Sequence, residues 1–292
     1  MKKAKKNVLT TASGSPVDND QNTIKGHPLG NFRLNLIDKS VVVLAGGSGI
    51  GKGVAIEFAK EKAKVMLVGR TEEKLVETQK YILNETGIAS SYFVADLTKN
   101  SDIENAIDSA RKMNGPIYAL FNNTGGPKPG FFSSFTDDDW NHAFELTLLS
   151  YVRAIRYVLP DMKKHGGRIV NNTSSSIKQA IESLLFSNVF RTGIVGLTKS
   201  LAKEFGQYNI LVNVVGAGKI STKRVDQIDS IKAKKLNVSL NDFQAANAKS
   251  IPLKRYGTPE EFGKLVTFLC SEANTYITGQ NILVEGGMVS AY

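Results

Sequence analysis

Short apolar runs alternate with longer amphipathic segments along most of the chain. The runs are continuous rather than interrupted by polar residues, which is typical of strands buried on both faces of a sheet. Helical periodicity between the runs indicates repeated strand–helix–strand units, and therefore parallel strands. We predict strands at 41–44, 65–68, 91–94, 117–121, 169–172, 211–215 and 281–284, and helices at 52–62, 73–83, 103–112, 140–163 and 189–205.

These elements predict one doubly wound α/β domain over residues 34–292, with a seven-stranded, mainly parallel sheet covered by helices on both faces. Residues 1–33 lack periodicity and are rich in Ser, Thr, Asn, Asp, Gly and Pro, so we expect an irregular arm there. The stretch 219–256 is longer and more polar than the other connections. A helix at 230–235 would make this stretch a lid over a binding site.

The most informative segment is 41–60, VVVLAGGSGIGKGVAIEFAK, in which an apolar run enters a glycine cluster and then a helical pattern. A strand, a glycine turn and a helix in this order present unpaired backbone N–H groups to a phosphate. Glycine lets the phosphate approach the backbone closely. The segment therefore predicts a nucleotide site, and a flexible glycine turn without a ligand is the alternative.

Three nucleotide-binding patterns compete for this segment. The P-loop pattern GxxxxGK[ST] matches as far as Lys52 but fails at Gly53, which lacks the hydroxyl that holds Mg²⁺. The dinucleotide pattern GxGxxG fails at Lys52, where its third glycine belongs. A third pattern, TGxxxGxG, matches at 49–51 and departs at 44–45, where Leu-Ala replaces Thr-Gly. The rest of the chain has to decide between them.

Composition and net charge limit the kinds of ligand and partner that we expect the chain to bind. The net charge of +10 suits an anionic cofactor or substrate, although a solvated basic surface gives the same number. The sequence has no clustered base-reading motif for nucleic acid, no apolar run of bilayer-spanning length and no His, Cys and carboxylate cluster for a metal. A single cysteine, Cys270, excludes an intramolecular disulfide and favours the cytoplasm.

Several later motifs resemble those of the short-chain dehydrogenases/reductases. The glycine turn at 45–51 resembles the cofactor turn of that family, NNTG at 122–125 resembles its NNAG, and NVVGAGKIST at 213–222 resembles its nicotinamide loop NxxxPGxIxT. RYGTPEE at 255–261 and the TG and EGG motifs within 278–287 resemble its C-terminal landmarks. A P-loop protein gives no reason for these motifs.

The resemblance covers about residues 35–287 and is nearest to the 3-oxoacyl-carrier-protein reductases. It implies a Rossmann-like fold, a small-molecule substrate and a dinucleotide lying across the carboxyl edge of the sheet. It also implies a homo-oligomer, a dimer or a tetramer, formed through the long helices near 140–163 and 183–205.

The end of the second strand indicates which dinucleotide is bound. A carboxylate that would hold the ribose 2′-OH of NAD is replaced by Gly69, and Arg70 follows. A guanidinium can hold a 2′-phosphate with two charge-assisted hydrogen bonds, so NADP is favoured over NAD, although Arg70 could be an ordinary surface residue. The cofactor-binding residues implied by the resemblance are Ala45, Gly46, Gly47, Ser48, Gly49, Ile50, Gly51, Arg70, Thr71, Asp96, Leu97, Asn123, Thr124, Gly125, Arg191, Ile220 and Thr222.

The catalytic positions depart from the family pattern. The family uses a Tyr as proton donor, a Lys one helical turn later, a Ser that binds the substrate oxygen and an Asn that supports a proton relay. Ser174, after the fifth strand, takes the Ser position, and the expected spacing then places Ser187 at the Tyr position and Arg191 at the Lys position, a register that GLTKSLA at 196–202 fixes. Thr147, seven residues after Trp140, takes the Asn position. A serine hydroxyl has a pKa far above the tyrosine value of about 10, and arginine stays protonated in proteins. Small packing and ion-pairing roles for Ser187 and Arg191 are the alternative.

Three functions remain open at this point. The first is an NADP(H)-dependent oxidoreductase acting on a small carbonyl compound, an alcohol or an activated alkene, acyl thioesters included, with water held by Ser174 and Ser187 as the proton source. The second is a catalytically degenerate nucleotide-binding protein with a regulatory or scaffold role. A P-loop phosphotransferase ranks last, because Gly53 breaks its pattern.

Overall fold

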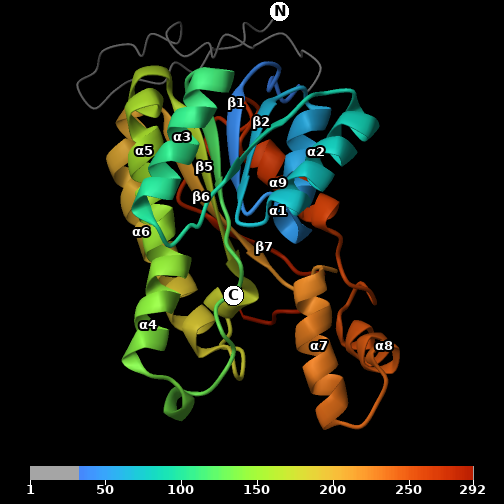
Figure 1. The fold of residues 1–292 in the computed structure, drawn as a ribbon. Coiled ribbons are helices and arrows are strands. Elements are labelled where there is room, and N and C mark those ends of the chain that lie inside the picture. Colours follow the sequence, from blue (N-terminus) through green and yellow to red (C-terminus); the bar gives the residue numbers. More distant parts are fainter. Residues whose placement is uncertain (1–32, 292) are drawn as a thin grey trace, which may run out of the picture. The chain divides into compact units, whose positions relative to one another are not determined.

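The computed structural model describes residues 33–291, and from Leu34 onward the chain forms one compact unit. A central sheet lies between two layers of helices (Figure 1). The irregular arm predicted at 1–33 falls outside the described residues, apart from Arg33.

The sheet has seven parallel strands in the order β3-β2-β1-β4-β5-β6-β7. The first three strands extend outward from β1, and the chain then crosses back to place β4 on the other side of β1. The order therefore reverses between β1 and β4, which is where doubly wound sheets bind ligands at their carboxyl ends. The strands are β1 (Ser40–Leu44), β2 (Lys64–Gly69), β3 (Ser91–Val94), β4 (Ile117–Asn122), β5 (Gly167–Ser174), β6 (Ile210–Ala217) and β7 (Asn281–Val284), which confirms the predicted doubly wound fold.

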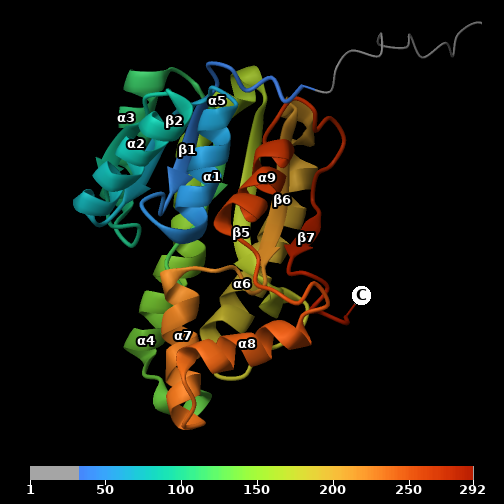
Figure 2. The same cartoon turned by 90° about the vertical axis from the view of Figure 1, so that its right-hand side faces the viewer.

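Helices cover both faces of the sheet, and others lie beyond its carboxyl edge (Figures 1 and 2). One face carries α1 (Gly49–Lys60), α2 (Glu72–Thr86) and α9 (Pro259–Leu269), and the other carries α3 (Asn100–Asn114), α5 (Ser150–His165) and α6 (Leu185–Phe205). Beyond the carboxyl edge lie α4 (Asp137–Phe144), α7 (Lys223–Lys235) and α8 (Leu240–Ser250).

The predicted helices differ from the observed ones in two places. The single helix predicted at 140–163 is divided into α4 and α5 by one π-helical turn, Glu145–Leu149. Helix α9 has no counterpart among the predicted helices, although Thr258 and Glu261 form a capping box at its start. The other helices predicted beside the sheet are present, and their ends differ from the predicted ones by at most four residues.

The central strand β1 explains why the apolar runs are continuous. Val41 and Val43 pack in the core beneath α1, α2 and α9, together with Phe58. Val42 and Leu44 pack in the core beneath α3 and α5. Because alternate residues point to opposite faces of a strand, a sheet covered on both faces needs apolar side chains at every position.

The stretch 219–256 contains a helical hairpin, α7 and α8, in place of the single short helix predicted at 230–235. Asp229 of α7 is fully buried and binds Lys219 Nζ and Tyr256 Oη, both at 2.8 Å. The two ends of the hairpin are also joined, because the Ser221 N–H donates to the Gly257 carbonyl at 2.8 Å. The hairpin is therefore fixed at its base, and its role as a lid stays a prediction.

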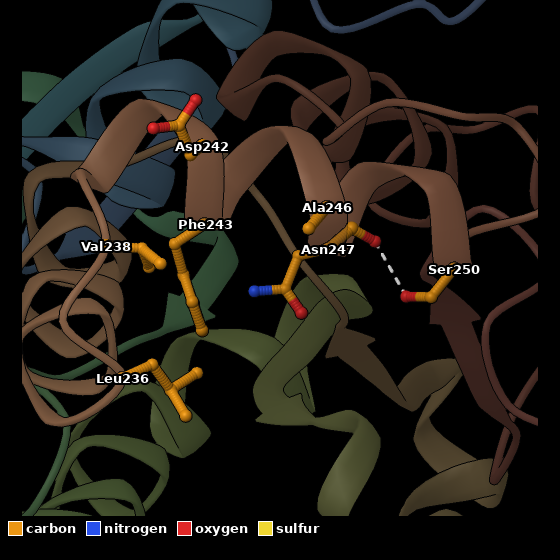
Figure 3. A pocket seen from close by; sticks show the side chains of 7 residues that line it. All are labelled: Leu236, Val238, Asp242, Phe243, Ala246, Asn247 and Ser250. Carbon is orange, nitrogen blue, oxygen red and sulfur yellow. Dashed lines mark hydrogen bonds between the residues drawn. The ribbon is translucent and has the colours of Figure 1, made fainter.

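A pocket of about 470 Å³ lies within this hairpin (Figure 3). Its apolar side is formed by residues of the α7–α8 connection together with Phe243. Asn247 and Ser250 of α8 supply polar atoms, and the Ser250 hydroxyl donates to the Asn247 carbonyl at 2.7 Å. The lining residues are Leu236, Val238, Asp242, Phe243, Ala246, Asn247 and Ser250.

Candidate functional site

The glycine turn between β1 and α1 forms a cradle of backbone amides. Ala45 and Gly49 have positive φ angles of 49° and 53°, so the chain reverses sharply between the strand and the helix. A Cβ on Gly51 would overlap the carbonyl oxygen of Ala45, which requires glycine there. Ser48, the exposed N-cap of α1, makes no side-chain capping hydrogen bond, and the first turn of α1 has no acidic residue. The helix start therefore offers uncapped N–H groups and the positive end of the helix dipole to an anion.

The orientation of Lys52 argues against a P-loop. In a P-loop the lysine reaches the β- and γ-phosphates held by the turn. Here Lys52 Nζ lies 4.3 Å from the ring centroid of Tyr81 and 3.8 Å from Glu77 Oε1, both on α2. The lysine thus joins α1 to α2, which agrees with a dinucleotide turn.

The loop after β6 meets the glycine turn from the opposite side. A Cβ on Gly49 would lie 3.3 Å from Thr222 Cγ2, so these distant segments are in contact. Thr222 also caps α7, because its hydroxyl accepts from the Val225 N–H at 3.3 Å. Ile220, two residues earlier, is buried. The predicted nicotinamide loop and the predicted phosphate turn therefore lie side by side.

Arg70 and Asp96 lie at the ends of β2 and β3. Arg70 is exposed and forms no ion pair among residues 33–291. Burial raises the pKa of Asp96, yet hydrogen bonds from Thr98 and the nearby charges of Arg70 and Lys99 bring that pKa below its usual value. Thr71 is the N-cap of α2 and makes no side-chain capping hydrogen bond. Arg70 and the Thr71 hydroxyl are both free to bind a ligand.

Asparagines tie β4 to β5 at the carboxyl edge. Asn122 Nδ2 donates to Asn171 Oδ1 at 2.8 Å, and Asn171 Nδ2 donates to Thr198 Oγ1 at 2.9 Å. Asn172 Nδ2 donates to Asn123 Oδ1 at 2.7 Å. The network therefore ties the two strands together, which gives Asn122 and Asn123 a structural role. Asn172 Oδ1 is buried with no partner in the described chain, so a ligand or water can still bind there.

The hydroxyl groups at the Ser and Tyr positions belong to one cluster. Ser187 on α6 is buried, and its Oγ lies 3.2 Å from Ser176 Oγ. Ser174 Oγ accepts from the Ser176 N–H at 3.2 Å. Ser176 was not among the predicted site residues, although it lies in the SSS run that begins at Ser174. The three hydroxyls can together hold a water or a substrate oxygen.

Arg191 and Tyr151 meet beside this cluster. Arg191 Nη1 and Tyr151 Oη donate to the carbonyl oxygen of Asn172, at 3.1 and 2.9 Å. Burial raises the pKa of Tyr151, and the nearby charge of Arg191 offsets only part of this. Tyr151 is therefore a neutral phenol within the site, and sequence reasoning missed it because no motif contains it. Its spacing of four residues from Thr147 is the one signal in the sequence.

Thr147 occupies the π-helical turn between α4 and α5. The residue is fully buried, and its hydroxyl has no hydrogen-bond partner within the described chain. Single π-helical turns occur frequently at functional sites, because they displace one residue from the helical ladder. The predicted Asn position therefore lies in a local irregularity of the helix, where the Thr147 hydroxyl has no hydrogen-bond partner among residues 33–291.

The sheet topology brings the predicted site residues to one edge. Residues 45–51, 70–71, 96–97, 123–125, 174 and 220–222 each lie at or just after the carboxyl end of a different strand. Thr147 and the pair Ser187 and Arg191 join them from the helices that cover one face. This edge includes the reversal of strand order between β1 and β4.

Residues 33–291 contain neither a candidate metal site nor a membrane-spanning helix. No group of three or more His, Cys, Asp and Glu side chains is placed to hold a metal ion. None of the described helices combines the length and apolarity required to cross a bilayer.

Known proteins resemble the chain over nearly all of the described part. The family model described as enoyl-(acyl carrier protein) reductase matches residues 44–289. The 3-oxoacyl-(acyl-carrier-protein) reductase FabG of Chlamydia muridarum is 30% identical over 255 residues, covering 87% of this chain and 98% of that protein. Dehydrogenase/reductase SDR family member 4 of Oryctolagus cuniculus is 30% identical over 257 residues, covering 87% and 95%.

Solved structures agree with these relatives. L-sorbose reductase from Gluconobacter frateurii, solved with NADPH and L-sorbose, has a TM-score of 0.84 at 28% identity and covers 89% of this chain and 99% of its own. A variant of actinorhodin polyketide ketoreductase, solved with NADPH, has a TM-score of 0.82 at 29% identity and covers 86% and 97%. The chain therefore belongs to the short-chain dehydrogenase/reductase family, in the branch of the 3-oxoacyl-carrier-protein reductases, as its motifs predicted.

Proposed function

We propose that the chain is an NADPH-dependent oxidoreductase that reduces a small carbonyl compound. The observation that carries the proposal is the uncapped start of α1, where the glycine turn presents free amides beside Thr222. Arg70, exposed and without an ion pair in the described chain, adds a phosphate-binding group at the end of β2. Both solved relatives described above contain NADPH, which supports the choice of cofactor.

The residues present fit this cofactor. Residues 47–51 would hold the pyrophosphate through backbone amides, because a phosphate can approach glycine without meeting a side chain. The Gly46 N–H is not among these donors, since it already donates to the Val68 carbonyl at 3.0 Å. Arg70 and Thr71 would hold the 2′-phosphate, and Asp96 with Leu97 would flank the adenine. Thr222 and Ile220 would lie beside the nicotinamide half. Gly69 stands at the position where a carboxylate would repel the 2′-phosphate, so this position carries no charge.

The side chains beside the nicotinamide position would stabilise the reacting oxygen. NADPH, when bound, supplies a hydride to the substrate carbon. Ser174 Oγ and the Arg191 guanidinium can donate hydrogen bonds to the oxygen on which negative charge develops, and one such donor is worth roughly 3–4 kcal/mol of barrier in enzymes that use it. Neither group can release a proton near neutral pH, so the proton comes from a water held by Ser174, Ser176 and Ser187. Loss of a dedicated acid costs roughly 10²–10⁴-fold in rate.

A catalytically degenerate binding protein is the second candidate. Two observations on hydroxyl groups favour it. The Ser187 hydroxyl is already hydrogen-bonded to the Ser176 hydroxyl, and burial raises the pKa of Tyr151. Cofactor binding without turnover on carbonyl, enoyl or thioester substrates would favour this candidate.

Titration calorimetry with NADPH and NADH tests the proposal. Arg70→Ala should weaken NADPH binding by about tenfold or more and leave NADH binding nearly unchanged, because only NADPH carries the 2′-phosphate. Lys112→Ala is the matched control, since Lys112 is an exposed cation in the last turn of α3, at the opposite edge of the sheet. Equal losses for both cofactors would remove the basis for NADPH, and no heat with either would end the proposal.

A homo-oligomer formed through α4, α5 and α6 is part of the same proposal. Phe144 on α4 and Val189 on α6 are 39% and 44% exposed, which leaves apolar surface on these helices. Sedimentation velocity tests it, with a dimer or tetramer as the expected result. The cytoplasmic location stays a prediction.

A further inference from the structure

Two arginines near the ends of β4 and β5 have no carboxylate partner among residues 33–291. Arg191 on α6 is only 6% exposed, and its Nη1 donates to the Asn172 carbonyl at 3.1 Å. Arg224, in the first turn of α7, is half-buried, and its Nη2 donates to the Pro127 carbonyl at 3.0 Å. A carbonyl accepts a hydrogen bond but carries no charge, so neither guanidinium is neutralised.

The two arginines flank the loop that follows β4. Within the loop, a Cβ on Gly126 would lie 3.2 Å from Arg224 Nε. At its near end, Asn123 Oδ1 accepts from Asn172 Nδ2 at 2.7 Å, and the Asn172 carbonyl binds Arg191. The two charges also influence each other, because burial and then the charge of Arg191 lower the pKa of Arg224.

The groups around the two arginines do not supply a counter-charge. Tyr151, which shares an acceptor with Arg191, stays a neutral phenol because burial raises its pKa. Asp229, the buried carboxylate of α7, is already bound to Lys219 Nζ at 2.8 Å and to Tyr256 Oη at 2.8 Å. Two unpaired cations in partly buried surroundings are unfavourable, and an anion between them would offset that cost.

We propose that Arg191 and Arg224 together bind a carboxylate of the substrate, so that the carbonyl compound reduced by this chain is a small oxo acid. This inference rests on the proposed reductase function and adds the substrate class. Arg191 lies one helical turn after Ser187 and reaches the end of β5, where Ser174 lies, so a carboxylate held there is close to the reacting carbonyl. A planar carboxylate also fits the guanidinium fork.

The phosphates of the cofactor do not require these two arginines. Its pyrophosphate has the amides of the glycine turn, and its 2′-phosphate has Arg70. Fixed positive charge beside the nicotinamide would oppose the positive charge that develops on that ring during reduction of the substrate. A carboxylate on the substrate removes this penalty, which is a second reason to place the anion between Arg191 and Arg224.

Binding measurements on the full chain test the inference without turnover. Acetoacetate, pyruvate and 2-oxoglutarate are each compared with their methyl esters by titration calorimetry, in the presence of NADP⁺, which cannot donate a hydride. We expect at least one acid to bind tenfold or more tightly than its ester, because hydrogen bonds to charged groups are the stronger ones. Arg224→Gln should remove this preference and leave ester binding unchanged.

Lys223→Gln is the matched control, because it removes an exposed positive charge one residue away. It should leave the acid preference unchanged, and Arg224→Lys should retain part of it. If Arg224→Gln fails to fold, the inference is tested by Arg224→Lys and by the salt dependence of wild-type binding. The affinity of the wild type for the acids, but not for the esters, should weaken as the ionic strength rises.

Three outcomes would overturn the inference. Equal affinity of wild type for all acids and their esters is the first, and an acid preference that survives in Arg224→Gln is the second. The third is a loss of NADP⁺ affinity in Arg224→Gln as large as its loss of acid affinity, which would assign this arginine to a cofactor phosphate. Failure of wild type to bind either NADP⁺ or NADPH overturns the proposed function instead, and the acid–ester comparison can still be made on the cofactor-free protein.

Discussion

Tyr151 and Arg191, which lie on different helices, donate to the same acceptor, the carbonyl oxygen of Asn172 at the end of β5. The contact joins α5 and α6 near the carboxyl end of β5. Because the phenol is neutral, Tyr151 leaves the charge of Arg191 available to an anion. Tyr151 is therefore a positioning residue for both the carbonyl and the guanidinium.

Tyr151→Phe should test this role, because it removes the hydroxyl and keeps the ring. We expect a loss of about 1 kcal/mol in the free energy of unfolding, measured in urea, for the lost hydrogen bond. The affinity for oxo acids should also fall, since Arg191 loses a neighbour that fixes its acceptor. Tyr276→Phe, at a residue that is 95% exposed, should change neither quantity. A Tyr151→Phe protein as stable and as acid-selective as the parent would contradict the role.

Ser187→Tyr combined with Arg191→Lys restores the family's proton donor and its partner. Carbonyl reduction should rise, by up to the roughly 10²–10⁴-fold that general acid catalysis supplies. The rate of the double variant should also depend on pH through ionisation of the introduced phenol. The rate of the parent should lack this pH dependence. The measurement is kcat for NADPH oxidation against pH, with Ser187→Tyr alone as the comparison. A double variant that binds NADPH and stays as slow as the parent would show that the missing acid was not limiting.

Lys52→Ala separates the dinucleotide site from a P-loop. Its ammonium group lies over the Tyr81 ring, away from the glycine turn, so we expect NADPH affinity to stay within about twofold and ATP with Mg²⁺ to give no binding heat. A small loss of stability is expected from the lost contact with α2. A large loss of nucleotide affinity would mean that Lys52 turns toward the phosphate when ligand binds, contrary to the structure.

The sheet and the cofactor edge could be predicted because their signals are local. Continuous apolar runs define strands buried on both faces, and topology then carries the residues after each strand to one edge. Gly46 to Gly51 come just after β1, and the NNTG and NVVGAGKIST segments run past the carboxyl ends of β4 and β6, so their positions followed from the fold.

The remaining features depend on contacts between distant segments. Tyr151 and Arg224 belong to no motif, and their relation to Arg191 exists only after α5, α6 and α7 are packed around the ends of β4 and β5. The π-helical turn at Glu145–Leu149 was missed because the helical period continues across it in the sequence. Helix α9 is short, and its sequence was interpreted through a family landmark rather than through its capping box.

Gly53→Ala tests the packing of α1 against α9. A Cβ at Gly53 would overlap the backbone of Pro259, so the helices must separate, and we expect a loss of about 1–3 kcal/mol in unfolding free energy. Gly206→Ala is the control, because Gly206 has a φ of −54° and open space around its Cβ position. That variant should be neutral or more stable by about 0.4–1 kcal/mol, and similar losses in both variants would contradict the packing argument.

Glu261 gives the stability of α9 a dependence on acid pH. Hydrogen bonds from Arg255, and next from the Thr258 N–H, lower the pKa of Glu261 from 4.5 to about 2. Because the folded pKa lies below the unfolded one, this stabilisation is fully present above about pH 4.5 and is lost as the pH falls toward 2. Wild type should therefore exceed Glu261→Gln in thermal stability at neutral pH, by a small amount because the pair is solvent-exposed, and the difference should narrow in acid. Glu260→Gln, which alters the same helical turn outside the capping box, should show a smaller difference. A gap between wild type and Glu261→Gln that stays constant down to pH 3 would contradict this assignment of the pKa.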